Sequence, residues 1–278
     1  MPNASHGDFP ETRLRCILRT EEGIKTVTQI IAVTNQKGGV GKTTTAVNLA
    51  YLLATPKRKV LLVDLDPQGN ATSSLAIDKG RLKSTLYDVL VNGLSPADIV
   101  HETSNKNLQV LPSNARLAEA EVELVNLPDR EQRLARALET VDADVVIIDC
   151  PPALGVLTIN ALVAANHVLI PVQSEYFALE GLSQLLSTVQ IIRERMNPRI
   201  DILGVVLTMF NKRMVLSEQV QQEVEKHFGP KVFNTVIPRN VRLAEAPSFG
   251  KTIHEHDKWS KGARAYKKLA EEVAKRLG

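Results

Sequence analysis

Cysteine is scarce in this chain: only Cys16 and Cys150 occur among 278 residues. Two widely separated thiols cannot form a disulfide framework or a CxxC metal site, and an iron–sulfur cluster needs four thiolates, which one chain cannot supply. Few cysteines are typical of a reducing compartment, and we therefore expect a cytoplasmic protein. We expect Cys150 to be a small buried residue.

Long apolar runs are also lacking. No segment approaches the ~18 consecutive apolar residues of a membrane span, and residues 1–22 lack the apolar centre of a signal peptide. With 44% hydrophobic and 23% charged residues, the chain can bury a full core. We expect a mobile tail at residues 1–27 and one domain at residues 28–278.

The most informative segment is a glycine-rich loop, KGGVGKTT, at residues 37–44. It follows a β-branched apolar run at 29–34 and precedes apolar residues at helical spacing at 43–53, the strand–loop–helix context of a phosphate-binding loop. Glycines let backbone N–H groups turn onto an anion, and the helix N-terminus adds partial positive charge. We predict a nucleoside triphosphate site formed by Lys37, Gly38, Gly39, Val40, Gly41, Lys42, Thr43 and Thr44. Lys42 is expected to reach the β- and γ-phosphates, and the Thr43 hydroxyl to ligate Mg²⁺.

Apolar strand patterns and helical patterns alternate along the rest of the chain. Strands are expected near residues 30–34, 60–63, 108–111, 144–148, 167–172, 202–208 and 232–237. This alternation predicts an α/β fold: a single-domain P-loop NTPase with a mostly parallel twisted sheet and helices on both faces. Right-handed crossovers bring the carboxyl ends of the strands to one edge of the sheet, where the chemistry is expected.

Two carboxylate motifs follow such strands. Residues 60–63 lead into Asp64 and Asp66, and residues 145–148 lead into Asp149. A carboxylate held close to a sheet edge needs a cation or hydrogen-bond donors. Asp149 fits a group that holds the Mg²⁺ shell, and Asp66 fits a group that orients the attacking water and joins Thr43 at the metal. Asp64 and Asp66 lie on the same side of an extended strand, so spacing leaves open which one positions the water.

Charge is unevenly distributed along the sequence. The net charge is +3, but residues 193–278 contain 17 Lys or Arg and only 10 Asp or Glu. A basic C-terminal third fits a polyanion partner, and it fits an ordinary solvated surface equally well.

Five motifs together resemble the ParA family of partition ATPases, in its Soj-like group. They are residues 37–44, 64–72 (DLDPQGNAT), 149–152 (DCPP), 171–176 (PVQSEY) and 237–248 (IPRNVRLAEAPS), so the resemblance covers roughly residues 28–277. It implies a cytoplasmic, nucleoid-associated ATPase that uses ATP and Mg²⁺. In such proteins the ATP-bound homodimer binds double-stranded DNA without sequence preference, and a ParB-type centromere-binding protein stimulates hydrolysis and release.

The resemblance also assigns roles to single residues. Lys37 is expected to reach the phosphates of the partner subunit, much as an arginine finger does, so that Lys37, Lys42 and Asp66 form the catalytic set. Pro238 and Asn240 lie in the segment that the family places near the adenine. Arg213 matches a family arginine important for DNA binding. Further DNA-binding candidates are Arg239 and Arg242, with Lys261, Arg264 and Lys268, which share one face of the predicted last helix.

Two other functions remain open. A membrane-positioning ATPase similar to MinD would need a C-terminal amphipathic helix with large apolar residues. The apolar stripe of the last helix suits packing on a sheet better; it consists of Ala263, Tyr266, Leu269, Ala270, Val273 and Leu277. A metabolic or signalling enzyme on the same scaffold, such as a capsule-synthesis tyrosine kinase, would carry a tyrosine-rich tail, whereas this chain has four Tyr in total.

Overall fold

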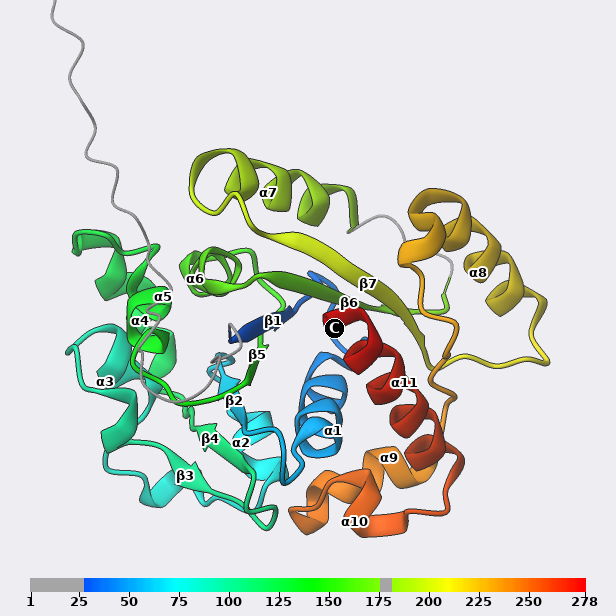
Figure 1. The fold of residues 1–278 in the computed structure, drawn as a ribbon, viewed down its shortest axis with the longest axis horizontal. Helices are drawn as coiled ribbons and strands as arrows, with labels where there is room; N and C mark the ends of the chain where they lie inside the picture. The colour runs from blue at the N-terminus through cyan, green and yellow to red at the C-terminus, as the bar shows by residue number, and fades with distance from the viewer. Residues whose placement is uncertain (1–27, 176–181) are drawn as a thin grey trace, which may run out of the picture.

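The computed structural model of the chain describes residues 28–175 and 182–278. The tail expected at residues 1–27, with Cys16, lies outside the described residues. A seven-stranded sheet runs through the described part, with helices on both of its faces (Figure 1). The α/β class and the mostly parallel sheet predicted from the sequence are confirmed. None of the described helices is both long and apolar enough to cross a bilayer.

The sheet contains central strands that are buried on both faces, which explains their continuous apolar sequences. Its strands lie in the order β3-β4-β2-β5-β1-β6-β7. All neighbours pair in parallel except β3 and β4, and the two-residue β3 was not predicted. The strands are β1 (Gln29–Val33), β2 (Val60–Asp64), β3 (His101–Glu102), β4 (Leu108–Leu111), β5 (Val145–Asp149), β6 (His167–Gln173) and β7 (Asp201–Thr208).

The helices divide between two hydrophobic clusters, one on each face of the sheet. One cluster includes buried side chains of α1 (Lys42–Leu53), α2 (Asn70–Ser74), α10 (Ile253–Asp257) and α11 (Lys261–Leu277). The other takes α3 (Leu86–Leu90), α4 (Leu117–Glu123), α5 (Arg133–Leu138), α6 (Val156–Ala164), α7 (Leu182–Arg195) and α8 (Val215–Phe228). The short α9 (Val241–Glu245) lies next to α10 (Figure 1).

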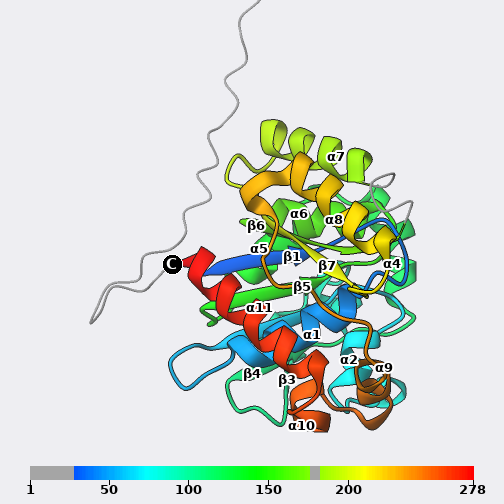
Figure 2. The same ribbon diagram turned by 90° about the vertical axis from the view of Figure 1, so that its right-hand side faces the viewer.

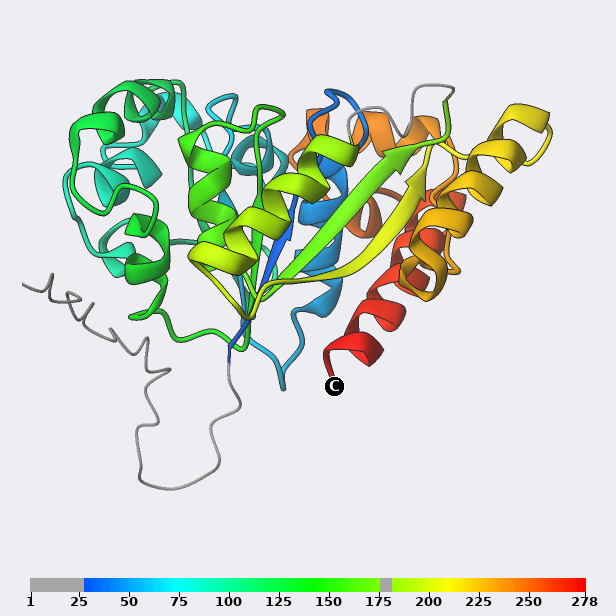
Figure 3. The same ribbon diagram turned by 90° about the horizontal axis from the view of Figure 1, so that it is seen from above.

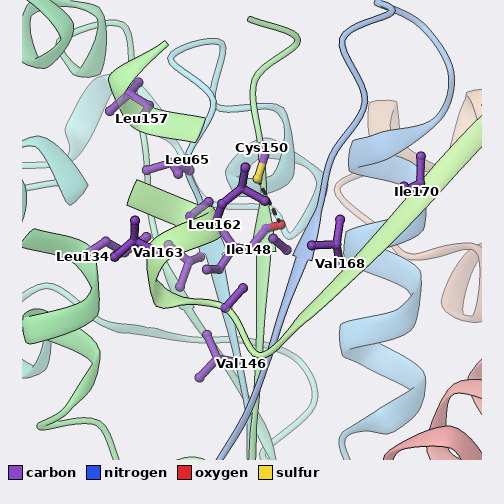
Figure 4. Close-up of a cluster of buried hydrophobic side chains, with 14 of the residues drawn as sticks. Leu65, Leu134, Val146, Ile148, Cys150, Leu157, Leu162, Val163, Val168 and Ile170 are labelled. Carbon is purple, nitrogen blue, oxygen red and sulfur yellow. Dashed lines mark hydrogen bonds between the residues drawn. The ribbon is translucent and has the colours of Figure 1, made fainter. Parts of the chain in front are cut away.

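Alternate residues of one strand serve the two clusters. On β2, Leu61 and Val63 belong to the cluster with α6, and Val60 and Leu62 belong to the cluster with α1. Figure 4 shows Cys150 at the end of β5 among apolar side chains, including Leu65 and Leu162 of that first cluster. Cys150 is fully buried, as expected from the sequence.

The strand order brings the predicted functional motifs to one edge. Asp149, the last residue of β5, is the register partner of Val33 on β1 and of Asp64 on β2. In Figure 3 the loop after β1 lies at the edge toward which the arrowheads of β6 and β7 point. The glycine-rich loop and both carboxylate motifs therefore meet at the carboxyl edge of the sheet.

The prediction of a strand at residues 232–237 is wrong. This segment passes alongside α11 (Figure 1) and makes only isolated bridges in the region of β7. The Asn234 N–H donates to Glu272 of α11 at 3.0 Å, and Arg276 of α11 donates to the Val232 carbonyl at 2.9 Å. On its other side, the Phe233 and Ile237 N–H groups donate to the Val205 and Leu207 carbonyls of β7 at 2.9 and 2.8 Å. Four residues separate these donors but only two separate the acceptors, so the two chains do not keep the regular register of a β-ladder.

Candidate functional site

The glycine-rich loop has the backbone shape that its sequence predicts. Gly39 and Gly41 have φ angles of +74° and +88°, in the left-handed region where a side chain is strained. Gly41 directly precedes α1, so the positive end of this 12-residue helix lies at the loop. A Cβ added at Gly39 would meet no atom within 4 Å, so the glycine is required by its backbone angle and open space remains beside it.

Lys42 begins α1 and bends back over the loop. Its Nζ donates to the Lys37 carbonyl at 3.1 Å, and the residue is only 7% exposed. Burial lowers the pKa of Lys42, an effect that the negative charge of Asp149 opposes. A phosphate group beside this ammonium would replace the water that burial has removed.

Lys37 is held within its own chain by a weak contact. Its Nζ pairs with Glu175 at 3.2 Å, and both side chains are partly exposed. Its backbone N–H donates to Asn35 Oδ1 at 3.0 Å, and Asn35 Nδ2 donates to the Pro171 carbonyl at 2.7 Å. Exposed ion pairs contribute only about 0–1 kcal/mol, so the backbone of Lys37 is fixed while its side chain is easily released.

Asp149 is a buried carboxylate that no well-formed hydrogen bond satisfies among the described residues, although the Thr43 hydroxyl and Lys42 lie near it. Neither of its oxygens has a hydrogen bond to the described residues. Burial raises the pKa of Asp149 well above its ordinary value, and repulsion from Asp64 adds to this, while the Thr43 hydroxyl and Lys42 act in the opposite direction. An unpaired buried carboxylate needs a cation, and carboxylate and hydroxyl oxygens suit Mg²⁺. Asp149 and Thr43 therefore fit the predicted metal.

No group of three or more His, Cys, Asp or Glu side chains within residues 28–175 and 182–278 could hold a metal ion. Protein Mg²⁺ sites commonly use one or two carboxylates and complete the shell with phosphate and water oxygens.

The contacts of Asp64 and Asp66 separate two residues that spacing could not. Asp64 is fully buried and accepts from both the Thr72 N–H and the Thr72 hydroxyl, at 2.7 and 2.6 Å. Burial raises the pKa of Asp64 to about 6, with the Thr72 bonds opposing. Asp66 lies beyond the end of β2, is 9% exposed, and accepts the Gln68 N–H through Oδ1. The Asp64 carboxylate is thus occupied by hydrogen bonds from Thr72, whereas Asp66 is the better placed of the two to contact a water molecule.

The segment predicted to lie near the adenine contains an unpaired acceptor. Asn240 Oδ1 is buried and has no hydrogen-bond partner in the described part of the chain. Pro238 forms an isolated bridge with Phe210, which anchors the segment beside the end of β7. An unpaired buried oxygen is costly, so a donor such as an amino group would stabilise it.

Three segments form a basic groove of about 1200 Å³. They are the loop at 210–213, the segment at 234–239 and the outer face of α11. Five of the six basic residues predicted to bind DNA line it together: Arg213, Arg239, Lys261, Arg264 and Lys268. Glu272 also lines the groove, but it accepts hydrogen bonds from Asn234 and Thr235.

The sixth predicted residue, Arg242, lies elsewhere. It is not part of the groove lining, and its guanidinium pairs with Glu245 at 2.8 Å and with Asp257 at 3.8 Å. Lys212 lines the groove and was missed as a site residue, although its place beside Arg213 in the sequence was a usable signal.

The inner face of α11 packs against α1 (Figure 2). The stripe residues Ala263, Tyr266, Leu269 and Val273 are buried, and the Tyr266 hydroxyl lies 3.1 Å from the Thr45 hydroxyl of α1. The apolar stripe is therefore covered by protein, as its sequence favoured, and is not an exposed face for lipid.

Sequence comparisons find a matching family and similar proteins. The AAA domain family matches residues 28–202. The sporulation initiation inhibitor protein Soj of Bacillus subtilis (strain 168) is 56% identical over 248 residues, which cover 88% of this chain and 98% of Soj. The chromosome partitioning protein ParA of Myxococcus xanthus (strain DK1622) is 51% identical over 260 residues, which cover 93% of this chain and 92% of that protein.

Solved structures share the fold and contain nucleotide. The cobyrinic acid a,c-diamide synthase of Mycobacterium smegmatis, with bound ATP analogue and magnesium, superposes with a TM-score of 0.79 and 38% identity, over 90% of this chain and 96% of that one. McdA of Cyanothece, in complex with ATP, gives a TM-score of 0.80 and 27% identity, over 91% and 97% of the two chains.

The phosphate loop, the carboxylates at its edge and these similarities show an ATPase that uses ATP and Mg²⁺. With relatives above 50% identity along nearly its whole described length, the chain belongs to the AAA domain family and, within it, to the Soj and ParA proteins.

Proposed function

We propose that this ATPase partitions DNA in the cell. ATP joins two copies of the chain into a homodimer, and the dimer binds double-stranded DNA without sequence preference through the basic groove. A ParB-type centromere-binding protein then stimulates hydrolysis, which separates the dimer and releases the DNA. The protein therefore works at the nucleoid. The observation that carries this proposal is the convergence of Arg213, Arg239 and three α11 cations on one groove.

The positive charge of the groove favours a polyanion as its ligand. The five predicted cations that line the groove are exposed, and none of them forms an ion pair with an acidic side chain among the described residues. Positive charge that the protein leaves uncompensated attracts phosphates, and releasing the counterions of DNA drives such binding. No base-reading geometry is needed, because phosphate contacts carry no sequence information.

We call the carboxyl edge of the sheet, with the glycine-rich loop and the two carboxylate motifs, the nucleotide edge. We assign one role to each group there. The loop backbone and Lys42 would hold the phosphates. Thr43 and Asp149 would hold Mg²⁺, which would supply positive charge to the phosphates. Asp66 orients the attacking water. Lys37 leaves Glu175 and meets the phosphates of the partner subunit, which makes hydrolysis depend on dimerisation.

The test is the binding of a fluorescent DNA duplex of arbitrary sequence, by anisotropy, with no nucleotide, with ADP, or with ATP and Mg²⁺, at two salt concentrations. We expect binding only in the presence of ATP and Mg²⁺, and we expect this binding to be weaker at the higher salt concentration. Arg213→Ala should weaken it about tenfold, the usual effect of losing one charge-assisted contact.

Lys267→Ala is the matched control, because Lys267 is exposed on α11 but does not line the groove. It should bind DNA like the parent. If the parent protein bound no DNA in any nucleotide state, the proposed function would be wrong, although the assignment of the ATP site would be unaffected.

A further inference from the structure

Thr208 is a buried residue that touches the phosphate loop from another strand. It ends β7 and is 2% exposed. Its hydroxyl donates to the Val40 carbonyl at 2.8 Å, and a Cβ on Gly41 would lie 3.8 Å from the Thr208 methyl group. The Thr208 carbonyl accepts the Ser174 N–H at 3.1 Å, which fixes the end of β7 against β6. Thr208 thus connects the turn of the phosphate loop with the ends of β6 and β7.

The peptide unit that Thr208 contacts joins Val40 to Gly41. Because a peptide is planar, the Val40 carbonyl and the Gly41 N–H rotate together. Backbone N–H groups of a phosphate-binding loop orient toward the anion. A bound phosphate that attracts the Gly41 N–H therefore also fixes the acceptor of the Thr208 hydroxyl.

The chain turns sharply after Thr208. Met209 has φ of +51°, a left-handed angle that is strained for a residue with a side chain and persists only when its neighbours hold it. They do so here: the Phe210 N–H donates to the Ile237 carbonyl at 3.0 Å, and the Arg239 N–H donates to the Phe210 carbonyl at 3.4 Å. The turn is therefore locked to the segment at 237–239.

Both of these segments are walls of the basic groove. The turn leads into Lys212 and Arg213, and the locked segment carries Arg239. A continuous series of hydrogen bonds and one strained turn thus runs from Val40 to two of the three walls. The third wall, α11, reaches the phosphate-loop helix through a separate contact between Tyr266 and Thr45.

We infer that Thr208 is the positioning residue through which a phosphate in the loop sets the placement of Arg213 and Arg239 within one subunit. This inference rests on the proposed DNA-binding function and names the residue that regulates it. ATP then controls the groove in two ways, by pairing the subunits and by ordering two groove walls inside each of them.

Hydrogen–deuterium exchange tests the link without DNA. We expect ATP and Mg²⁺ to slow exchange at residues 209–213 of the parent by at least about fivefold, the lower end of common coupling factors. In Thr208→Val, which keeps the shape but loses the hydroxyl, this protection should disappear while ATP still protects residues 37–44. Thr208→Ser should behave like the parent. Equal protection at 209–213 in Thr208→Val, or none in the parent, would overturn the inference.

Met209→Gly supplies a second variant, which relaxes the strained turn and so tests the link even where Thr208→Val does not fold. Exchange at 209–213 should then stay fast with and without ATP. ATP-dependent protection as strong as that of the parent would contradict the proposed path.

DNA binding at saturating ATP, with dimerisation checked by sedimentation, separates this inference from the proposed function. The ratio of DNA affinity with ATP to that without nucleotide should fall at least about fivefold in Thr208→Val. A parent ratio of one would refute the DNA-binding proposal, while the exchange result would still decide the role of Thr208. A Thr208→Val protein that fails to dimerise would place the effect at the subunit interface and refute the inference.

Discussion

The nucleotide edge and the basic groove hold their charges in opposite ways. At the edge, Lys42 and Asp149 are buried, and Asp149 lacks any hydrogen-bond partner among the described residues. In the groove, Arg213, Arg264 and Lys268 are exposed. A buried charge interacts strongly with whatever binds beside it, so single changes there should be decisive. Exposed charges act weakly and are screened by salt, so the groove should depend on the number of its cations.

The largest effect is expected for Lys42→Ala. Removing the buried ammonium takes away the cation that meets the phosphates, and we expect the ATPase rate to fall at least about 100-fold, as for other electrostatic groups of this kind. Steady-state phosphate release measures it. Lys57→Ala removes an exposed lysine and should change nothing. A Lys42→Ala protein with parental activity would disprove the site assignment.

Asp66→Ala should come next. We expect hydrolysis to fall about 100-fold, because an acid–base or water-orienting group commonly contributes that much, while ATP still binds. The ATP-bound dimer should then remain on DNA, which a dissociation experiment in excess competitor DNA measures. Asp78→Ala, at an exposed carboxylate, is the control. Release as fast as that of the parent would count against Asp66.

Asp149→Asn should separate stability from function. Because burial raises the pKa of Asp149, its charge destabilises the nucleotide-free fold at pH 7. Asn removes the charge, so the free energy of unfolding without nucleotide should rise by about 1–3 kcal/mol in urea denaturation, while stabilisation by Mg²⁺ and ATP is lost. A less stable nucleotide-free variant at pH 7 would contradict this account.

The size of the stabilisation by Asp149→Asn depends on pH. A raised folded-state pKa means that the unfavourable charge is absent below the unfolded value, near 3.8, and develops as pH rises through the folded value. The advantage of Asp149→Asn should therefore shrink as the urea experiment is repeated toward pH 4.

The smallest effect is expected for Glu175→Gln. This change removes the exposed partner of Lys37, whose pairing contributes about 0–1 kcal/mol. ATP-dependent dimerisation, measured by sedimentation, should tighten by up to about fivefold at low salt, and the difference should vanish at high salt. Weaker dimerisation of the variant would show that Glu175 supports the dimer instead of holding Lys37 back.

The nucleotide edge could be predicted well because its motifs are local. Left-handed glycines, apolar strands and the acidic residues that end them occur within a few positions of one another, and parallel strands bring them together. Spacing could not separate Asp64 from Asp66, because the difference comes from Thr72, which folds back to donate twice to Asp64.

The groove could be predicted only in part, because three distant segments form it. The helical face with Lys261, Arg264 and Lys268 follows from spacing. Arg242 pairs with Glu245 three residues on in α9, which spacing could also have indicated, whereas its pair with Asp257 depends on how α9 and α10 are placed. The false strand at 232–237 has the same cause. Its apolar pattern is real, but Phe233 and Ile237 meet β7 out of regular register, and Glu272 and Arg276, far along the chain, bind the groups on its other side.

The most direct test of ATP-controlled DNA binding by the groove is the salt dependence of DNA affinity in the ATP and ADP states. For the ATP state we predict a steep linear fall of log affinity with log salt. The double variant Arg213→Ala/Arg264→Ala should reduce the slope by about two for each groove of the dimer that contacts the DNA. For the ADP state we predict no measurable binding. Equal binding in both states, or a slope that the double variant leaves unchanged, would contradict the account.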